Sequence, residues 1–198
     1  MKEKYKPLLY CISLVIYQSI LYFIAKLSPF NITLIGSNLD NKIPFIDEFI
    51  YFYISWYLML FVVPYLIYKK DKDIFKKYLI TIIACNTFVF FIYFLYPTTI
   101  NRPNIIVKDI TSFITYFIYK IDTPALNCFP SMHCIISFIY MYIVIFENKF
   151  SKYRLVIITW SSLIILSTLF VKQHVLLDVL GAFVISLVIY FVVNKKCS

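Results

Sequence analysis

The sequence predicts an all-α membrane protein, a single domain built as a bundle of six transmembrane helices. Of its 198 residues, 62% are hydrophobic, 20% aromatic and only 15% charged. Soluble domains contain about 45–50% apolar and about 25% charged residues, so this composition excludes an ordinary soluble protein. The charges also fall in clusters between six long apolar runs. Each run approaches the roughly 17–25 residues that a helix needs to cross a hydrocarbon core of about 30 Å.

The predicted spans, in chain order, cover residues 8–27, 49–68, 78–96, 131–146, 155–171 and 175–193. The first span follows Lys2, Lys4 and Lys6 and lacks a small-residue cleavage site. It is also longer than the apolar core of a signal peptide, so we expect a retained helix. The longest connection, residues 97–130, contains an aromatic-rich stretch at 110–119 that is too short to span. We expect this stretch to lie along the membrane interface as a short helix.

Positive charge predicts the orientation of the spans. Of the 19 lysines and arginines, 13 lie before the first span, after the last span, or in the connections that follow the second and fourth spans. Because cytoplasmic connections retain positive charge, both termini are expected in the cytoplasm. The connections after the first, third and fifth spans are then outside.

The net charge of +9 arises from short runs of lysine beside apolar segments, not from one helix face. This pattern argues against a nucleic-acid partner and favours a solvated rim touching anionic lipid. The predicted location is therefore the membrane itself. The abundance of Lys, Asn, Ile and Tyr is typical of an AT-rich bacterial genome, which indicates a bacterial cell membrane.

The five cysteines show no paired metal-ligand spacing, and we expect most of them to act as small hydrophobic residues. Cys128 and Cys134 lie near the histidine described next, so a disulfide or a reactive thiol stays open there. The five are Cys11, Cys85, Cys128, Cys134 and Cys197.

The chain has two histidines, and the predicted topology places both at the outer ends of spans. His133 follows Pro130 and Ser131, a combination that predicts the start of a helix. The serine hydroxyl and the first unpaired amides of such a helix bind phosphate readily.

The second histidine, His174, lies at the start of the last span, and Asp178 follows it four residues later. This spacing places the carboxylate on the same helix face, one turn deeper. A carboxylate there can hold the proton on one ring nitrogen and leave the other nitrogen as a nucleophile. An ionisable group inside a span also needs a partner, which His174 supplies.

Together these residues resemble the type-2 phosphatidic acid phosphatase superfamily. The family motifs read K-x6-R-P, P-S-G-H and S-R-x5-H-x3-D. The chain carries Arg102 with Pro103, then 130–133, then Ser167 with His174 and Asp178. The resemblance implies a six-helix bundle with its site at the outer membrane face, a histidine nucleophile, and neither cofactor nor metal.

Three motif positions differ from the family pattern. Leu95 stands at the position of the first lysine, Met132 at that of the glycine, and Thr168 at that of the second arginine. Lys172 lies two residues before His174 and is predicted to replace one of the missing cations. Met132 and the Lys-Gln-His sequence resemble the branch that includes inositol phosphorylceramide synthase-like enzymes.

The predicted reaction transfers a phosphoryl group of a lipid substrate. His174 attacks phosphorus, Asp178 fixes its tautomer, and His133 serves as general acid and then as general base. Arg102, Ser131 and Lys172 are expected to bind the phosphate oxygens. The favoured interpretation is that the protein is a lipid phosphate or lipid pyrophosphate phosphatase.

Other functions are also compatible with the sequence. A phosphotransferase of the same chemistry would pass the phospho-headgroup to a lipid alcohol. A transporter or scaffold would keep the fold without turnover. Two histidines and an aspartate could also supply three zinc ligands, although the adjacent cations Arg102 and Lys172 argue against a divalent metal.

Overall fold

The computed structural model describes residues 5–196 and consists of a helical bundle with smaller elements at one end. The bundle helices are α1 (Lys6–Ala25), α3 (Ile50–Lys70), α4 (Lys72–Leu95), α6 (Met132–Phe146), α7 (Arg154–Phe170) and α8 (Leu176–Lys196). The smaller elements are α2 (Asn38–Lys42), η2 (Asp47–Phe49), α5 (Ile110–Ile121), η3 (Asn148–Tyr153), β1 (Thr33–Leu34) and β2 (Thr98–Thr99). The two strands pair in parallel.

Within residues 5–196, five helical segments are long and apolar enough to cross a membrane: α1, η2 with α3, α4, η3 with α7, and α8. The helices are those of an all-α integral membrane protein. α6 is shorter, with 15 residues, and most of its side chains are buried. It packs between α7 and α8 and has residues such as Ile135, Ile139 and Tyr140 fully buried. Five of the six predicted spans therefore meet the length criterion, and the sixth is the buried centre of the bundle.

The predicted span bounds agree with the structure to within three residues, except at α4, which begins at Lys72 and not at residue 78. Asp71 caps this helix, because its carboxylate accepts hydrogen bonds from the amides of Asp73 and Ile74, both at 2.9 Å. Carboxylates at this position stabilise a helix start. The first turns of α4 are charged, so hydrophobicity alone detects the helix only where the apolar part begins.

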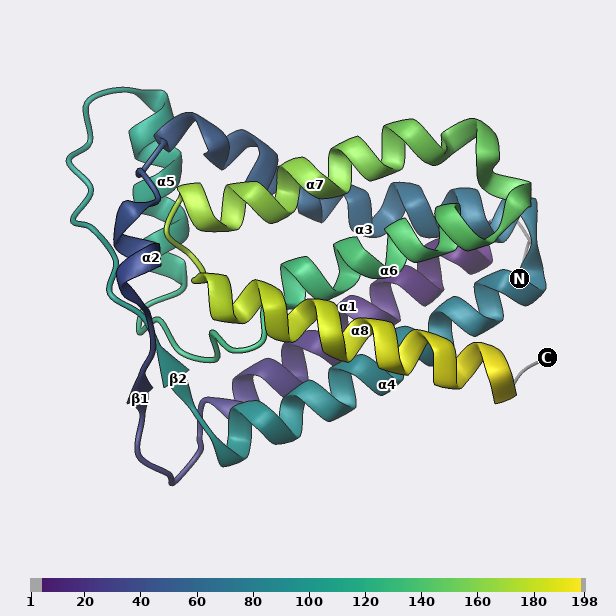
Figure 1. The fold of residues 1–198 in the computed structure, drawn as a ribbon, viewed down its shortest axis with the longest axis horizontal. Helices are drawn as coiled ribbons and strands as arrows, with labels where there is room; N and C mark the ends of the chain where they lie inside the picture. The colour runs from purple at the N-terminus through teal and green to yellow at the C-terminus, as the bar shows by residue number, and fades with distance from the viewer. Residues whose placement is uncertain (1–4, 197–198) are drawn as a thin grey trace.

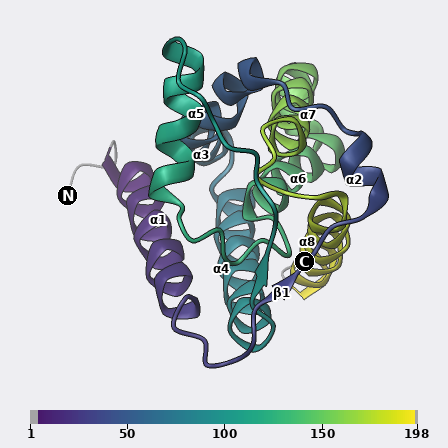
Figure 2. The ribbon, with the colours of Figure 1, turned by 90° about the vertical axis from the view of Figure 1, so that its left-hand side faces the viewer.

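All of the smaller elements except η3 gather at one end of the bundle. Figure 1 shows α2, α5, β1 and β2 on the left, opposite the first residues of α1 and the last residues of α8. Figure 2 looks onto this end, where α5 lies in front of α3, with α1 below it in the view. The predicted interfacial helix at 110–119 is α5, and Asp109 caps it by accepting a 2.8 Å hydrogen bond from Ser112. This end of the bundle holds both histidines.

Candidate active site

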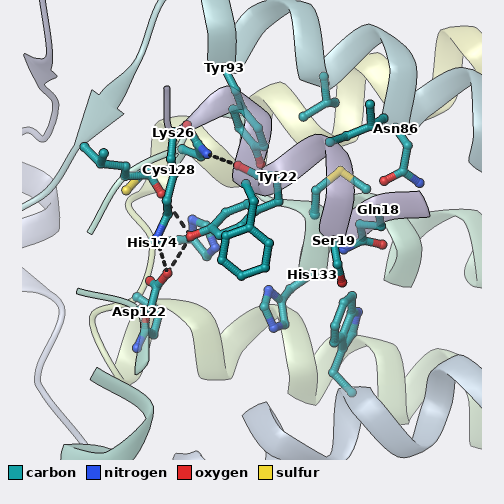
Figure 3. A pocket seen from close by; sticks show the side chains of 18 of the residues that line it. Gln18, Ser19, Tyr22, Lys26, Asn86, Tyr93, Asp122, Cys128, His133 and His174 are labelled. Carbon is teal, nitrogen blue, oxygen red and sulfur yellow. Dashed lines mark hydrogen bonds and ion pairs between the residues drawn. The ribbon is translucent and has the colours of Figure 1, made fainter. Parts of the chain in front are cut away.

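A cavity of about 300 Å³ opens among α1, α3, α4, α5, the first turn of α6 and the connections that precede α6 and α8. Its wall includes His133, His174 and Arg102. Figure 3 shows the two histidines facing this space together with Tyr22, Lys26 and Asp122. The structure thus brings Arg102 together with His174, which lies 72 positions later in the sequence.

The two imidazole rings lie 6.1 Å apart, centre to centre. Nε2 of His133 is buried and has no hydrogen-bond partner within residues 5–196. Both rings line the same cavity. They are close enough for a nucleophile and a general acid to reach one phosphate group bound there.

His174 is held by Asp178, as the four-residue spacing predicted. Nδ1 of His174 lies 3.0 Å from Oδ2 of Asp178, and the amide of Val175 donates to the same oxygen at 3.0 Å. Asp178 is fully buried. His174 itself precedes α8, which begins at Leu176, and its amide donates to the carbonyl of Thr168 at 3.0 Å. With Nδ1 engaged by Asp178, Nε2 is the ring nitrogen available for chemistry.

The start of α6 is attached directly to α8. Ser131 caps α6 by accepting a hydrogen bond from the amide of Cys134 at 3.4 Å, and its own amide donates to the carbonyl of Asp178 at 3.3 Å. The ring of Phe129 packs on α8 at Gly181, where a Cβ atom would lie 2.4 Å from Cε2 of that ring. This close approach requires glycine. The two contacts fix the helix starts that carry His133 and Asp178.

Aromatic side chains of α3 surround the ring of His133. Trp56 lies 4.1 Å and Tyr53 4.5 Å from it, and the Tyr53 ring is stacked. Such contacts stabilise a ring in one orientation. The sequence contains so many aromatic residues that neither of these could be singled out from it.

Two cations reach the cavity, and one of them was not predicted. Arg102 donates from Nη2 to Oδ2 of Asp122 at 2.6 Å and from Nη1 to the Asp122 carbonyl at 3.3 Å. Lys26, at the C-terminal end of α1, lies 3.6 Å from the other carboxylate oxygen, to which Tyr22 also donates at 2.5 Å. Nothing in the sequence linked Lys26 or Asp122 to the motifs.

The other two predicted phosphate ligands do not line this cavity. Lys172 donates from Nζ to the carbonyls of Asp40 and Ile43, at 2.8 and 2.6 Å, in a neighbouring pocket that His174 also touches. Burial lowers the pKa of Lys172, although the Asp40 carboxylate acts in the opposite direction. Ser131 is fully buried and caps α6. Phosphate binding by either residue stays a prediction.

The four described cysteines, Cys11, Cys85, Cys128 and Cys134, are buried and free. Burial raises the pKa of Cys128, which lies in the connection before α6, to about 12. This shift disfavours the reactive thiolate of Cys128 at neutral pH. Cys128 and Cys134 are both free, so neither forms the possible disulfide in this structure.

Comparison with known proteins shows a family match over the region that contains the site. A family model described as the PAP2 superfamily matches residues 75–196, which include both histidines, Arg102 and Asp178. Searches of curated proteins and of solved structures returned no match.

Proposed function

The chain belongs to the PAP2 superfamily, and on that premise we propose that it is a membrane phosphatase that hydrolyses a lipid phosphate or lipid pyrophosphate through a phosphohistidine. Members of this superfamily are phosphatases acting on phosphate esters. The observation that carries the proposal is the 6.1 Å separation of the His133 and His174 rings across one cavity.

In the first step, Nε2 of His174 attacks phosphorus, and the bond from phosphorus to the leaving oxygen breaks. His133, protonated, donates a proton to that oxygen. Asp178 holds the proton on Nδ1 of His174 and stabilises the positive charge that develops on the ring, with which it is in contact at 3.0 Å.

In the second step, a water molecule attacks the phosphorus of phosphohistidine while His133 accepts its proton. The bond from nitrogen to phosphorus breaks, and His174 is released. Arg102 lines the cavity, and its buried Nε has no partner in the described part of the chain. This donor can neutralise charge on the transferred group, an effect that usually dominates phosphoryl transfer.

The walls of the cavity support a lipid as the substrate. Away from the histidines the lining is largely apolar and comes from α1, α3 and α4, including Val15, Leu60, Val89 and Phe90. α1 is also the least buried of the long helices. A hydrocarbon chain can therefore extend from the site toward the bilayer between these helices while its phosphate stays at the histidines.

The distribution of lysines indicates which face of the membrane the cavity occupies. The lysine-rich ends of α3, α4 and α8 lie at the opposite end of the bundle from the cavity. Since positive connections stay in the cytoplasm, the cavity would face the outside of the cell membrane, with both termini inside.

A substrate screen tests this function. Purified protein in detergent is incubated with phosphatidic acid, phosphatidylglycerol phosphate and polyprenyl pyrophosphate, and inorganic phosphate and lipid products are measured together. Release of phosphate with the matching dephosphorylated lipid is the expected result. Transfer of the phospho-headgroup to a lipid alcohol without phosphate release would instead identify the protein as a transferase. If no substrate gave a product, the protein would be better explained as a transporter or scaffold.

A further inference from the structure

We infer that Lys26, from the first helix, binds the phosphate group of the substrate together with Arg102, and that Asp122 holds the two cations in position. The inference rests on the proposed function. Lys26 lies outside residues 75–196, the part of the chain that the family model matches, so the family pattern does not assign it.

The position where the family motif has a lysine cannot supply this charge. Leu95 occupies it, is 58% exposed, and is not part of the cavity wall. Lys26 approaches the same end of the bundle from α1, which packs along α4. Two residues further on, the hydroxyl of Ser28 donates to the carbonyl of Phe94 at 2.6 Å and ties the end of α1 to the end of α4. The cation is thus delivered from a different helix.

The contacts of Lys26 leave its ammonium group with donors to spare. Nζ makes a long hydrogen bond of 3.4 Å to the Pro124 carbonyl and lies 3.6 Å from Asp122, beyond hydrogen-bond distance. It also lies 4.7 Å from the ring centre of Tyr22. An ammonium has three donors, so at least one is available for a ligand in the cavity that Lys26 lines.

One carboxylate faces two cations here, which leaves an excess of positive charge at the cavity wall. Asp122 contacts Arg102 on one oxygen and lies near Lys26 on the other. Two other described groups lie beside this cluster: Tyr22, which is a neutral hydrogen-bond donor to Asp122, and His174, which lines the same cavity. A phosphate group, which carries one or two negative charges, would balance this cluster.

An alternative explanation is that Lys26 only stabilises the C-terminal end of α1, where positive charge is favourable. In that case the affinity of the cavity for phosphate should not depend on Lys26. The two explanations therefore differ in a binding measurement that does not need turnover.

Isothermal titration of the purified protein with inorganic phosphate tests the inference. Lys26→Met, which keeps the length of the side chain, should weaken phosphate binding about tenfold or more, as expected for loss of one charge-assisted hydrogen bond. Lys26→Arg should restore most of the affinity. The matched control is Lys120→Met, because Lys120 lies on α5 and is exposed outside the cavity.

Equal phosphate affinity in Lys26→Met and the original protein would overturn the inference. Equal losses of affinity in Lys26→Met and Lys120→Met, or no measurable phosphate binding by the original protein, would also overturn it. The substrate screen is a separate readout: a protein that hydrolyses lipid phosphate but binds phosphate without help from Lys26 keeps the proposed function and loses only this inference. Asp122→Asn should raise KM more than it lowers kcat, because Asp122 is a positioning residue.

Discussion

Nδ1 of His174 lies 3.0 Å from Oδ2 of Asp178, a carboxyl group with no exposed surface. The carboxylate is anchored in turn by the amide of Val175, at 3.0 Å. A buried carboxylate is costly unless it is paired, so its presence here indicates that the pairing itself has a use. In the proposed reaction it fixes the tautomer of His174 and stabilises the ring as phosphate is transferred.

Replacement of Asp178 by Asn should lower kcat by up to about 10⁴-fold, the loss that follows when the orienting carboxylate of a catalytic histidine is changed in the same way. Steady-state hydrolysis of a lipid phosphate measures it. Asp73→Asn, which changes an exposed acid at the other end of the bundle, is the control. Activity of Asp178→Asn within tenfold of the original protein would contradict this role.

His133→Gln should lower kcat/KM, which reports on the first step, by about 10²–10⁴-fold for a lipid alcohol leaving group. The loss should shrink for p-nitrophenyl phosphate, because its leaving group departs without a proton. Comparison of the two substrates in the same variant checks the assignment of His133 as general acid. An equal loss with both substrates would argue that His133 has some other function.

Trp56 should matter because its ring lies 4.1 Å from that of His133. Trp56→Ala removes one side of the aromatic setting, so the His133 ring can move away from the phosphorus, and kcat should fall about 10- to 100-fold. Trp56→Phe keeps a ring and should stay close to the original activity. If the alanine variant were as active as the phenylalanine variant, packing on His133 would have no catalytic consequence.

Asp40 should stabilise the start of α8 in a pH-dependent manner. Its carboxylate accepts a 2.8 Å hydrogen bond from the amide of Leu176. Burial alone would raise the pKa of Asp40, but the hydrogen bonds from Leu176 and Ser37, with Lys172 nearby, lower it below its ordinary value of 3.8. A lowered pKa means that the contribution is complete above that value and is lost as the pH falls below it.

Asp40→Ala should therefore reduce the free energy of unfolding by about 0.5–2 kcal/mol at neutral pH, the usual range for a lost cap. Thermal unfolding in detergent at several pH values measures this difference. The original protein and the variant should converge as the pH drops below about 3.8. A difference that stays constant down to pH 3 would show that the charge of Asp40 has no part in it.

Chelation of metals should leave the activity unchanged, and vanadate should inhibit, because a five-coordinate phosphorus mimic suits a histidine nucleophile. Assays with and without EDTA, and with added zinc, check this expectation. Loss of activity on chelation with recovery on zinc addition would favour the alternative in which both histidines and Asp178 serve as metal ligands.

The sequence predicted the parts of the site that depend on local spacing. The start signal at Ser131 is found as the cap of α6, and the predicted contact between His174 and Asp178 is also present. The two residues do not share a helix face as predicted, because His174 precedes α8 and Asp178 lies in its first turn. Hydrophobicity likewise located the long helices, because five of those described are long and apolar enough to cross a membrane.

Residues that meet only through tertiary packing were missed. Lys26, Trp56 and Asp122 come from three separate segments and have no spacing relation to the motifs. Conversely, proximity in sequence suggested that Lys172 would join Arg102. The chain instead turns at Lys172, with φ of +50°, and directs its ammonium to the carbonyls of Asp40 and Ile43.

The most direct test is detection of phosphate on His174. Incubation of His133→Gln with ³²P-labelled p-nitrophenyl phosphate should trap the intermediate, because its good leaving group permits the first step while loss of the general base slows the second. The account predicts a base-stable, acid-labile label that peptide mass spectrometry places on His174 and that His174→Ala abolishes. Turnover of lipid phosphate by His174→Ala, or a label on any other residue, would contradict it.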